Sequence, residues 1–141
     1  MTRIDFYISQ TSRDQDRFRL ACRITEKAYK LGNSVYIHTD SSEQTGLIDD
    51  LLWTFRDGSF VPHQTDTGNS EKSVPVLIGH DKERQHEADV LINLAHEIPA
   101  CFSQFERVAE VVNETPESTA QARERYKFYR DRGYELQTHK L

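Results

Sequence analysis

Two short, mostly apolar segments constrain the fold of this chain more than any other feature. They are residues 76–78 and 89–94, and a charged turn at 79–87 separates them. Short apolar segments of this kind are typical of strands that are buried on both faces, as in a parallel sheet with helices on each side. We therefore expect both segments to be central strands of a largely parallel sheet.

The remaining sequence alternates strand-like and helix-like patterns around these two segments. β-branched and aromatic residues favour strands, and apolar residues at helical spacing favour helices that end near Gly32 and Gly133. The expected strands are 4–8, 34–38, 76–78, 89–94 and 107–112, and the expected helices are 14–31, 43–55 and 115–132, with a long polar loop at 64–73. This alternation indicates one α/β domain over residues 1–141, with three α/β/α layers and a largely parallel sheet.

The charge balance limits the partners that such a domain can bind. The chain has 18 basic and 23 acidic residues, which gives a formal net charge of −5. This charge repels nucleic-acid phosphates and acidic membranes, so an anionic partner must be met by a local group of cations. No apolar run approaches the roughly 20 residues that span a bilayer, and no secretory signal is visible at the N-terminus. The sequence therefore predicts a cytoplasmic protein without a membrane segment.

The glycines do not form a nucleotide-binding loop. Residues 68–73 contain a Lys-Ser pair, but no glycine directly precedes the lysine, and a strand follows where a phosphate loop requires a helix. The first strand-to-helix turn, at 9–14, contains no glycine, so a dinucleotide fingerprint is absent. We expect no cofactor.

Cysteine and histidine spacing gives no metal site and no clear nucleophile. Cys22 and Cys101 are far apart, as expected of reduced thiols in a cytosolic protein, and neither has a Cys or His at ligand spacing. His96 begins a sequence like that of a zinc-protease helix, but the second histidine is missing and Pro99 would break the helix. A Cys101 nucleophile would need His63 or His96 as its base. No catalytic residue is predicted.

Large apolar residues gather where the second predicted helix ends. Trp53 lies in that helix, and Phe60, Val61 and Pro62 follow a glycine and precede the polar loop. Apolar residues in such a place form either part of the core or an exposed patch that binds a partner, and aromatic anchors often dominate protein interfaces. The residues alone leave both interpretations open.

The last predicted helix carries a cationic and aromatic strip. Arg123, Tyr126, Lys127 and Arg130 are three, four and seven positions apart, so they share one helix face, with Tyr129 beside it. The strip is either a receptor for an acidic partner with an apolar end or a solvated cationic face whose tyrosines pack inward. Spacing alone does not decide between the two.

A family resemblance runs through nearly the whole chain in order. The segments that carry it are residues 5–7, Leu52 and Trp53, residues 59–63, 74–78 and 89–94, Phe102 and Phe105, residues 107–112 and 122–130, and Gly133. Together they resemble the chi subunit family of bacterial DNA polymerase III. Membership implies an α/β fold with no intrinsic activity, in a non-catalytic accessory subunit of a DNA-directed DNA polymerase holoenzyme that acts during DNA replication.

The resemblance also implies two partners. One surface would bind the psi subunit of the clamp loader through Trp53 and Phe60, with Val61 and Pro62 in the same interface, and a repair helicase is a candidate competitor for it. Another surface would bind the acidic C-terminal tail of single-stranded DNA-binding protein. The family's tail-binding residues match Arg123, Tyr126 and Lys127, and Arg130 extends the same helix face.

One departure from the family pattern lies at the start of this helix. A basic residue that is present there in well-known relatives is replaced here by Ser118 and Thr119. The resemblance therefore implies a weaker tail site, or compensation by Arg125 or Arg130.

Two other functions remain as alternatives. The last helix could bind single-stranded nucleic acid directly, with Arg123, Lys127 and Arg130 on phosphates and Tyr126 stacked on a base. The net charge of −5 argues against this, and any contact with nucleic acid is expected to be mainly indirect. A small α/β enzyme with an unrecognised site is the third candidate.

Overall fold

The computed structural model describes residues 2–66, 74–81 and 88–141, so the 68–73 motif, most of the predicted polar loop and most of the charged turn lie outside the described residues. The described part contains seven strands, three α-helices and one short 3₁₀ turn. In chain order these are β1 (Arg3–Ile8), α1 (Asp14–Lys30), β2 (Val35–His38), α2 (Ser42–Thr54), β3 (His63–Thr65), β4 (Val76–Gly79), β5 (Val90–Asn93), the 3₁₀ turn η1 (Phe102–Gln104), β6 (Arg107–Val112), α3 (Pro116–Asp131) and β7 (Glu135–Lys140).

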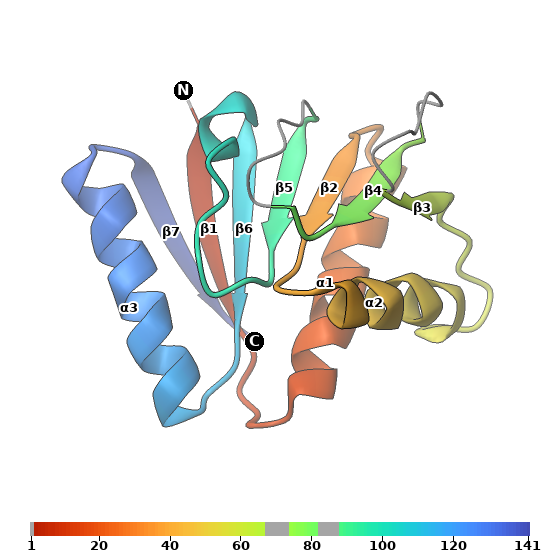
Figure 1. Ribbon diagram of the computed structural model, residues 1–141, viewed down its shortest axis with the longest axis horizontal. Coiled ribbons are helices and arrows are strands. Elements are labelled where there is room, and N and C mark those ends of the chain that lie inside the picture. Colours follow the sequence, from red (N-terminus) through yellow and green to blue (C-terminus); the bar gives the residue numbers. More distant parts are fainter. Residues whose placement is uncertain (1, 67–73, 82–87) are drawn as a thin grey trace.

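All described strands join one parallel sheet in the order β3-β4-β2-β5-β6-β1-β7 (Figure 1). The two segments that were expected to be central, β4 and β5, both have a strand on each side. The prediction of a largely parallel sheet with these two strands inside it is confirmed. Parallel strands require crossover connections, which explains why helices lie on both faces.

Each face of the sheet has its own apolar core. On one face, Ile37, Ile78 and Ile92 pack with Cys22 of α1 and Leu52 of α2. The other core lies under α3 and η1, and its buried residues are Ile4, Phe6, Tyr36, Leu91, Cys101, Phe102, Phe105, Val108, Val112 and Tyr129. The three-layer α/β/α arrangement is therefore confirmed.

The helix ends follow the predicted signals. Gly32 and Gly133 have φ values of +87° and +82°, which only glycine adopts easily, directly after α1 and α3. Thr115 caps α3, because its side chain accepts a hydrogen bond from the Ser118 N–H, and Pro116 occupies the first turn.

Neither edge strand was predicted from the sequence. His63–Thr65 forms β3, which overlaps the start of the stretch at 64–73 that was expected to be a loop, and Glu135–Lys140 forms β7 after the last helix. Their side chains are mostly polar and are only partly buried or exposed, because an edge strand gives one or both of its faces to solvent. The apolar signal on which strand prediction depends is therefore weak at both edges.

A buried carboxylate attaches α3 to the sheet. Glu110 of β6 is fully buried and accepts hydrogen bonds from Arg125 Nε at 2.8 Å and Tyr129 Oη at 2.7 Å, both on α3. Asn93 of β5 donates a third at 3.0 Å. Burial raises the pKa of Tyr129 well above its ordinary value, so this phenol remains a donor. Because every bond is made to a buried charge, loss of one partner leaves that charge uncompensated.

We predict that Arg125→Ala lowers the free energy of unfolding by about 3–5 kcal/mol, since it leaves the buried Glu110 charge without its guanidinium. The matched control is Arg123→Ala, two positions earlier and exposed, which should change it by less than about 0.5 kcal/mol. Urea denaturation of both variants measures the difference. Equal stability of the two variants would contradict the anchoring role of Arg125.

Candidate functional site

An apolar groove lies beside α3, between this helix and the carboxyl ends of β1 and β7. Its volume is about 320 Å³. Its lining residues are Phe6 and Ile8 of β1, Val112 of β6, Asn113 and Glu114, Thr119, Ala122, Arg123 and Tyr126 of α3, and Thr138 and Lys140 of β7. We call this the tail groove, after the protein tail that the family resemblance leads us to expect there. Its floor is apolar, and polar and charged side chains stand at its rim.

The predicted strip on α3 is exposed but only part of it lines the tail groove. Arg123 and Tyr126 do so, and the Tyr126 ring lies 5.4 Å from the Phe6 ring between centroids. Lys127 and Arg130 are exposed on the same helix outside the lining, and Arg130 lies 3.4 Å from Asp131. The structure thus brings two of the four predicted residues into the groove and leaves two beside it.

Two residues that were weighed with the strip face the core instead. Tyr129 is fully buried on Glu110, so it is not part of the exposed face. Arg125 is also buried, and its guanidinium binds Glu110 and the carbonyl oxygen of His96. Arg125 is therefore not available to compensate for the missing basic residue. Of the two residues that replace it, Thr119 lines the tail groove.

Lys140 is a groove residue that the sequence analysis missed. It lies at the end of β7 and lines the tail groove opposite the α3 side chains, together with Thr138. Because β7 was not predicted as a strand, nothing placed its side chains next to α3. A strand pattern of period two along 134–140 could have predicted the position of Lys140, since residues 136, 138 and 140 share one face of a strand.

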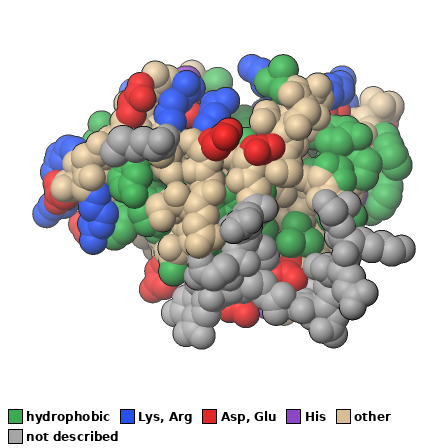
Figure 2. All heavy atoms as spheres, turned by 90° about the horizontal axis from the view of Figure 1, so that it is seen from above, with side chains coloured by type: hydrophobic (Ala, Val, Ile, Leu, Met, Phe, Trp, Pro, Cys, Tyr) green, Lys and Arg blue, Asp and Glu red, His purple; other side chains and the backbone are tan. Residues whose placement is uncertain are grey.

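An aromatic patch lies at the opposite end of the sheet, near α2 and β3. Trp53 is 54% exposed and Phe60 is 68% exposed, and their rings lie 6.1 Å apart between centroids. Val61 is buried in the core and Pro62 is half-buried, so Trp53 and Phe60 provide the exposed aromatic surface. Figure 2 shows hydrophobic side chains gathered at this end of the molecule, whereas Lys and Arg side chains lie at the α3 end and along the upper edge of the view.

Polar contacts hold the loop that carries Phe60 in place. Glu26 of α1 accepts a hydrogen bond from Arg56 at 2.7 Å and another from the Ser59 hydroxyl. The bond to Arg56 contributes most to holding the pKa of Glu26 below its ordinary value. His63 anchors the other end, with one ring nitrogen 3.0 Å from the Asp49 carbonyl oxygen. The aromatic patch is therefore preorganised.

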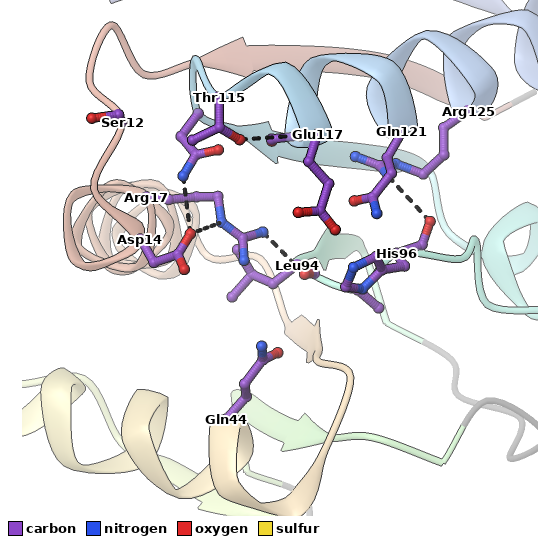
Figure 3. Close-up of a pocket in the computed structure, with 13 residues that line it drawn as sticks. Ser12, Asp14, Arg17, Gln44, Leu94, His96, Thr115, Glu117, Gln121 and Arg125 are labelled. Atoms are coloured by element: carbon purple, nitrogen blue, oxygen red, sulfur yellow. Dashed lines mark hydrogen bonds and ion pairs between the residues drawn. The ribbon is translucent and has the colours of Figure 1, made fainter.

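A polar cleft of about 350 Å³ lies where loops leave the carboxyl ends of β1, β5 and β6, between the first turns of α1 and α3. In open α/β sheets, ligands often bind at such an edge, where connections leave toward opposite faces. Figure 3 shows Arg17 on one side of this cleft, with Glu117 and Gln121 facing it from α3. The position alone makes it a candidate site.

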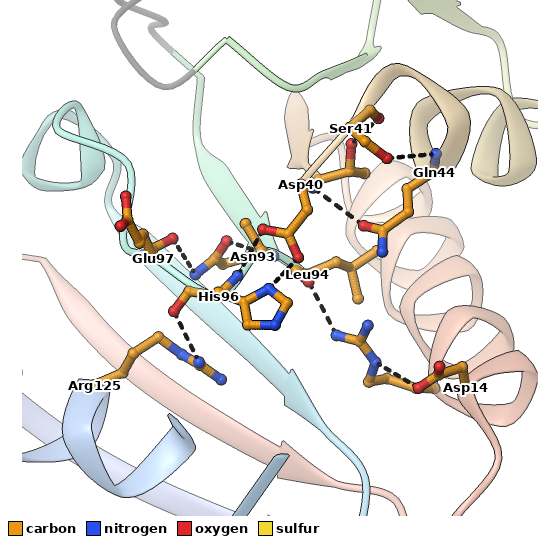
Figure 4. Close-up of polar contacts among 12 residues, drawn as sticks. Asp14, Asp40, Ser41, Gln44, Asn93, Leu94, His96, Glu97 and Arg125 are labelled. Atoms are coloured by element: carbon orange, nitrogen blue, oxygen red, sulfur yellow. Dashed lines mark hydrogen bonds and ion pairs between the residues drawn. The ribbon is translucent and has the colours of Figure 1, made fainter. Parts of the chain in front are cut away.

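The contacts within the cleft mostly join its own residues. Arg17 donates to the Leu94 carbonyl oxygen at 3.0 Å and lies 3.9 Å from Asp14, and burial lowers its pKa. His96 contacts the Asp40 carboxylate through both its backbone N–H and its ring (Figure 4). The arrangement connects the loops after β1, β2 and β5, and its cations and carboxylates largely offset one another.

The thiols of this chain are buried and unlinked. Cys22 and Cys101 are buried in the two cores without a disulfide between them, and burial raises the pKa of Cys22 to about 12. Such a thiol is almost entirely protonated at neutral pH and is a poor nucleophile. The histidines weighed as bases for Cys101 have other contacts, His63 with backbone carbonyl oxygens and His96 with Asp40.

Within residues 2–66, 74–81 and 88–141, no three His, Cys, Asp or Glu side chains are grouped to hold a metal ion. No helix in the same ranges is long and apolar enough to cross a bilayer.

These features define an α/β domain with an all-parallel open sheet, a groove at one end and an exposed aromatic patch at the other. The model of the DNA polymerase III chi subunit (HolC) family matches residues 1–137, and the chain belongs to this family. It is 40% identical over 141 residues to DNA polymerase III subunit chi of Pseudomonas aeruginosa, which covers all of this chain and 98% of that relative.

Two more distant relatives have the same description. The chain is 32% identical over 120 residues to DNA polymerase III subunit chi of Haemophilus influenzae, covering 84% of this chain and 83% of the relative. It is 31% identical over 121 residues to that of Escherichia coli, covering 85% and 82%. The family resemblance read from the sequence is confirmed.

We predict that Phe60→Ala leaves stability nearly unchanged, because most of its side chain is exposed, whereas its neighbour Val61→Ala lowers the free energy of unfolding by about 2 kcal/mol through loss of buried methyl groups. Thermal and urea unfolding of the two variants measure this. A large loss of stability in Phe60→Ala would mean that the aromatic patch is part of the core.

Proposed function

We propose that this chain links two proteins of the replication machinery. The tail groove binds the acidic C-terminal tail of single-stranded DNA-binding protein, and the aromatic patch binds the psi subunit, which joins the chain to the clamp loader. The observation that carries the proposal is the tail groove itself, in which an apolar floor lies next to exposed Arg123 and Lys140. As a polymerase subunit that works on the chromosome, the chain acts in the cytoplasm.

The tail groove suits a peptide that ends in an apolar side chain and a free carboxylate. Phe6, Ile8 and Val112 provide an apolar floor for the side chain, and Tyr126 provides an aromatic wall. The Arg123 guanidinium at the rim can take the carboxylate through two parallel N–H donors. Arg123 is exposed and takes part in no ion pair among the described residues, so its donors are open to a ligand.

Charges around the tail groove set the direction of the peptide. Glu114 stands at the end near the start of α3, where it repels an acidic segment. Lys127 and Arg130 lie further along the same helix and are exposed. The acidic residues that precede the peptide end are therefore expected to leave the groove toward Lys127 and Arg130.

The binding strength of such a site follows from its exposure. Its ionic contacts are open to solvent and are screened by salt, so the Kd is expected on the order of micromolar at physiological ionic strength. Several binding-protein tails on one coated strand would raise the effective affinity well above that of a single tail.

The positions of the two surfaces support a bridging role. The aromatic patch is next to β3, one edge of the sheet, and the tail groove is next to β7, the other edge (Figure 1). Two partners bound there would not overlap. One partner can therefore bind while the other is in place.

We predict that Arg123→Ala weakens binding of an acidic tail peptide by about tenfold, the loss expected for one bidentate charge-assisted contact. Lys140→Ala should weaken it by a smaller factor. Calorimetry at low and physiological salt measures both. The matched control, Arg132→Ala, removes the same charge from the end of α3 away from the groove and should leave affinity unchanged. Unchanged peptide affinity in Arg123→Ala would refute the site.

We predict that Phe60→Ala reduces binding to psi by at least about tenfold, because exposed aromatic anchors carry a large share of interface energy. Its matched control is Leu31→Ala, which removes an equally exposed apolar side chain at the end of α1. Co-purification and calorimetry with psi measure the effect. Equal psi binding by both variants would show that the aromatic patch is not part of the psi interface. The tail-peptide measurements test the other half of the proposal separately.

A further inference from the structure

One part of the sheet surface is not covered by a helix. The odd-numbered residues of β1 face the side on which α1 packs, but α1 lies over β6, β5 and β2. β7 pairs with β1 at the edge, and its residues Glu135 and Gln137 are exposed on that side. We call this surface, bounded by α1 and formed by β1, β7 and the start of β6, the open face. It lies on the other side of the sheet from α3 and the tail groove.

A row of cations on α1 runs along the open face. Arg19, Arg23 and Lys27 are four residues apart, so they stand in line along the helix, roughly 6 Å apart along its axis. All three are exposed, and no ion pair involves them among the described residues. This row contributes to the lining of two hollows. One, of about 500 Å³, is lined by Arg19 and Arg23 next to the loop after β1, and the other, of about 80 Å³, is lined by Lys27 next to β1 and β6.

More cations stand on the strands, arranged around one buried carboxylate. Asp5 accepts hydrogen bonds from Arg3 at 3.2 Å, Arg107 at 3.1 Å and His139 at 3.0 Å. Burial alone raises the pKa of Asp5, but these three donors outweigh it and hold the pKa below its ordinary value. Arg3 and Arg107 remain 39% and 43% exposed. Asp5 thus fixes two guanidinium groups that are both partly exposed to solvent.

An aromatic pair lies on the same surface. Tyr7 and His139 are direct cross-strand neighbours, and their rings stack with centroids 4.8 Å apart and planes 16° apart. The His139 side chain is 37% exposed. A partly exposed ring held flat by a neighbouring ring offers a platform on which another planar group can stack.

The open face is positive although the chain is acidic. Among the residues that form it, five cations, Arg3, Arg19, Arg23, Lys27 and Arg107, stand against three side-chain carboxylates, those of Asp5, Asp16 and Glu135. One of the three, Asp5, is buried. The whole chain has a net charge of −5, so the positive charge of the open face is opposite in sign to that of the chain as a whole.

From these observations we propose that the open face binds single-stranded nucleic acid directly. Unpaired cations in a line match a phosphate backbone, and a stacked aromatic platform beside them matches an unpaired base, which is how single strands are held without sequence preference. An acidic protein segment would use the cations but not the platform. Double-stranded DNA would hide its bases from the platform, so single strands should bind more tightly.

The proposal is independent of tail binding, because the two surfaces lie on opposite sides of β1 and β7. A chain bound to a tail through α3 can still contact nucleic acid through the open face. The chain would then be attached at two points, to the tail through α3 and to the single-stranded nucleic acid through the open face, which is bivalent binding.

The test uses fluorescence anisotropy of a labelled oligothymidine with the purified full chain. The chain should bind at roughly 50 mM salt, and affinity should fall steeply as salt rises. The double variant Arg23→Glu with Lys27→Glu should lose at least about tenfold, and its log-log salt slope should fall by about 1.4, the value for two single-strand phosphate contacts. The matched control, Lys127→Glu with Arg130→Glu on α3, makes the same charge change and should stay within about twofold.

The aromatic platform is tested with two variants of one residue. Both His139→Ala and His139→Phe remove the hydrogen bond to Asp5, but only the second keeps a ring. We expect about a tenfold loss of affinity for His139→Ala, as for one base stack, and recovery of most of it in His139→Phe. Circular dichroism and thermal unfolding confirm that each variant is folded.

Several results would overturn the proposal. These are no binding by the unaltered chain at low salt, an equal loss in the α3 control, and displacement of the oligonucleotide by an acidic tail peptide. The last two would assign nucleic-acid binding to α3. Loss of tail-peptide binding in the α1 variant would also contradict the separation of the two surfaces, whereas failure of the open face alone leaves the tail groove intact.

Discussion

The hydrogen bonds to Glu110 are the contact on which the rest of the functional surface depends. This buried carboxylate joins β6 and β5 to α3 through Asn93, Arg125 and Tyr129. With three partners it fixes both the position of α3 above the sheet and its rotation about its own axis. Since Arg125 and Tyr129 point inward, Arg123, Tyr126 and Lys127 must point outward or sideways. A buried charge thus selects which cations of a cation-rich helix are available to a partner.

The sequence predicted the interior of the sheet well and its edges poorly. Strands β4 and β5 were found because they are apolar on both faces, and α1 because its apolar stripe and Gly32 leave little ambiguity. Strands β3 and β7 are polar, because pairing on one side and solvent on the other require no apolar pattern. The missed strand β7 matters most, since it supplies Lys140 to the tail groove and His139 to the open face.

At the candidate sites, too, the sequence pattern predicted some features, and others depend on tertiary packing. Helical spacing correctly grouped Arg123, Tyr126, Lys127 and Arg130, but it could not show that only Arg123 and Tyr126 line a groove. Nor could the sequence separate Trp53 and Phe60, which are exposed, from Val61, which is buried in the core. These distinctions depend on partners that are distant in sequence, such as Phe6 below Tyr126. A pattern within one segment contains no information about such partners.

Strand β1 explains how one small sheet can have functional surfaces on both sides. Its even-numbered residues Ile4 and Phe6 form the apolar floor under α3, and its odd-numbered residues Asp5 and Tyr7 form the polar floor beside α1. The parallel strand β7 repeats this division, with Lys140 on one side and His139 on the other. Because the side-chain period of a strand is two, a shift of one residue would exchange both surfaces. The pairing of β1 with β7 is therefore a constraint on both sites at once, and any change in their register would disable them together.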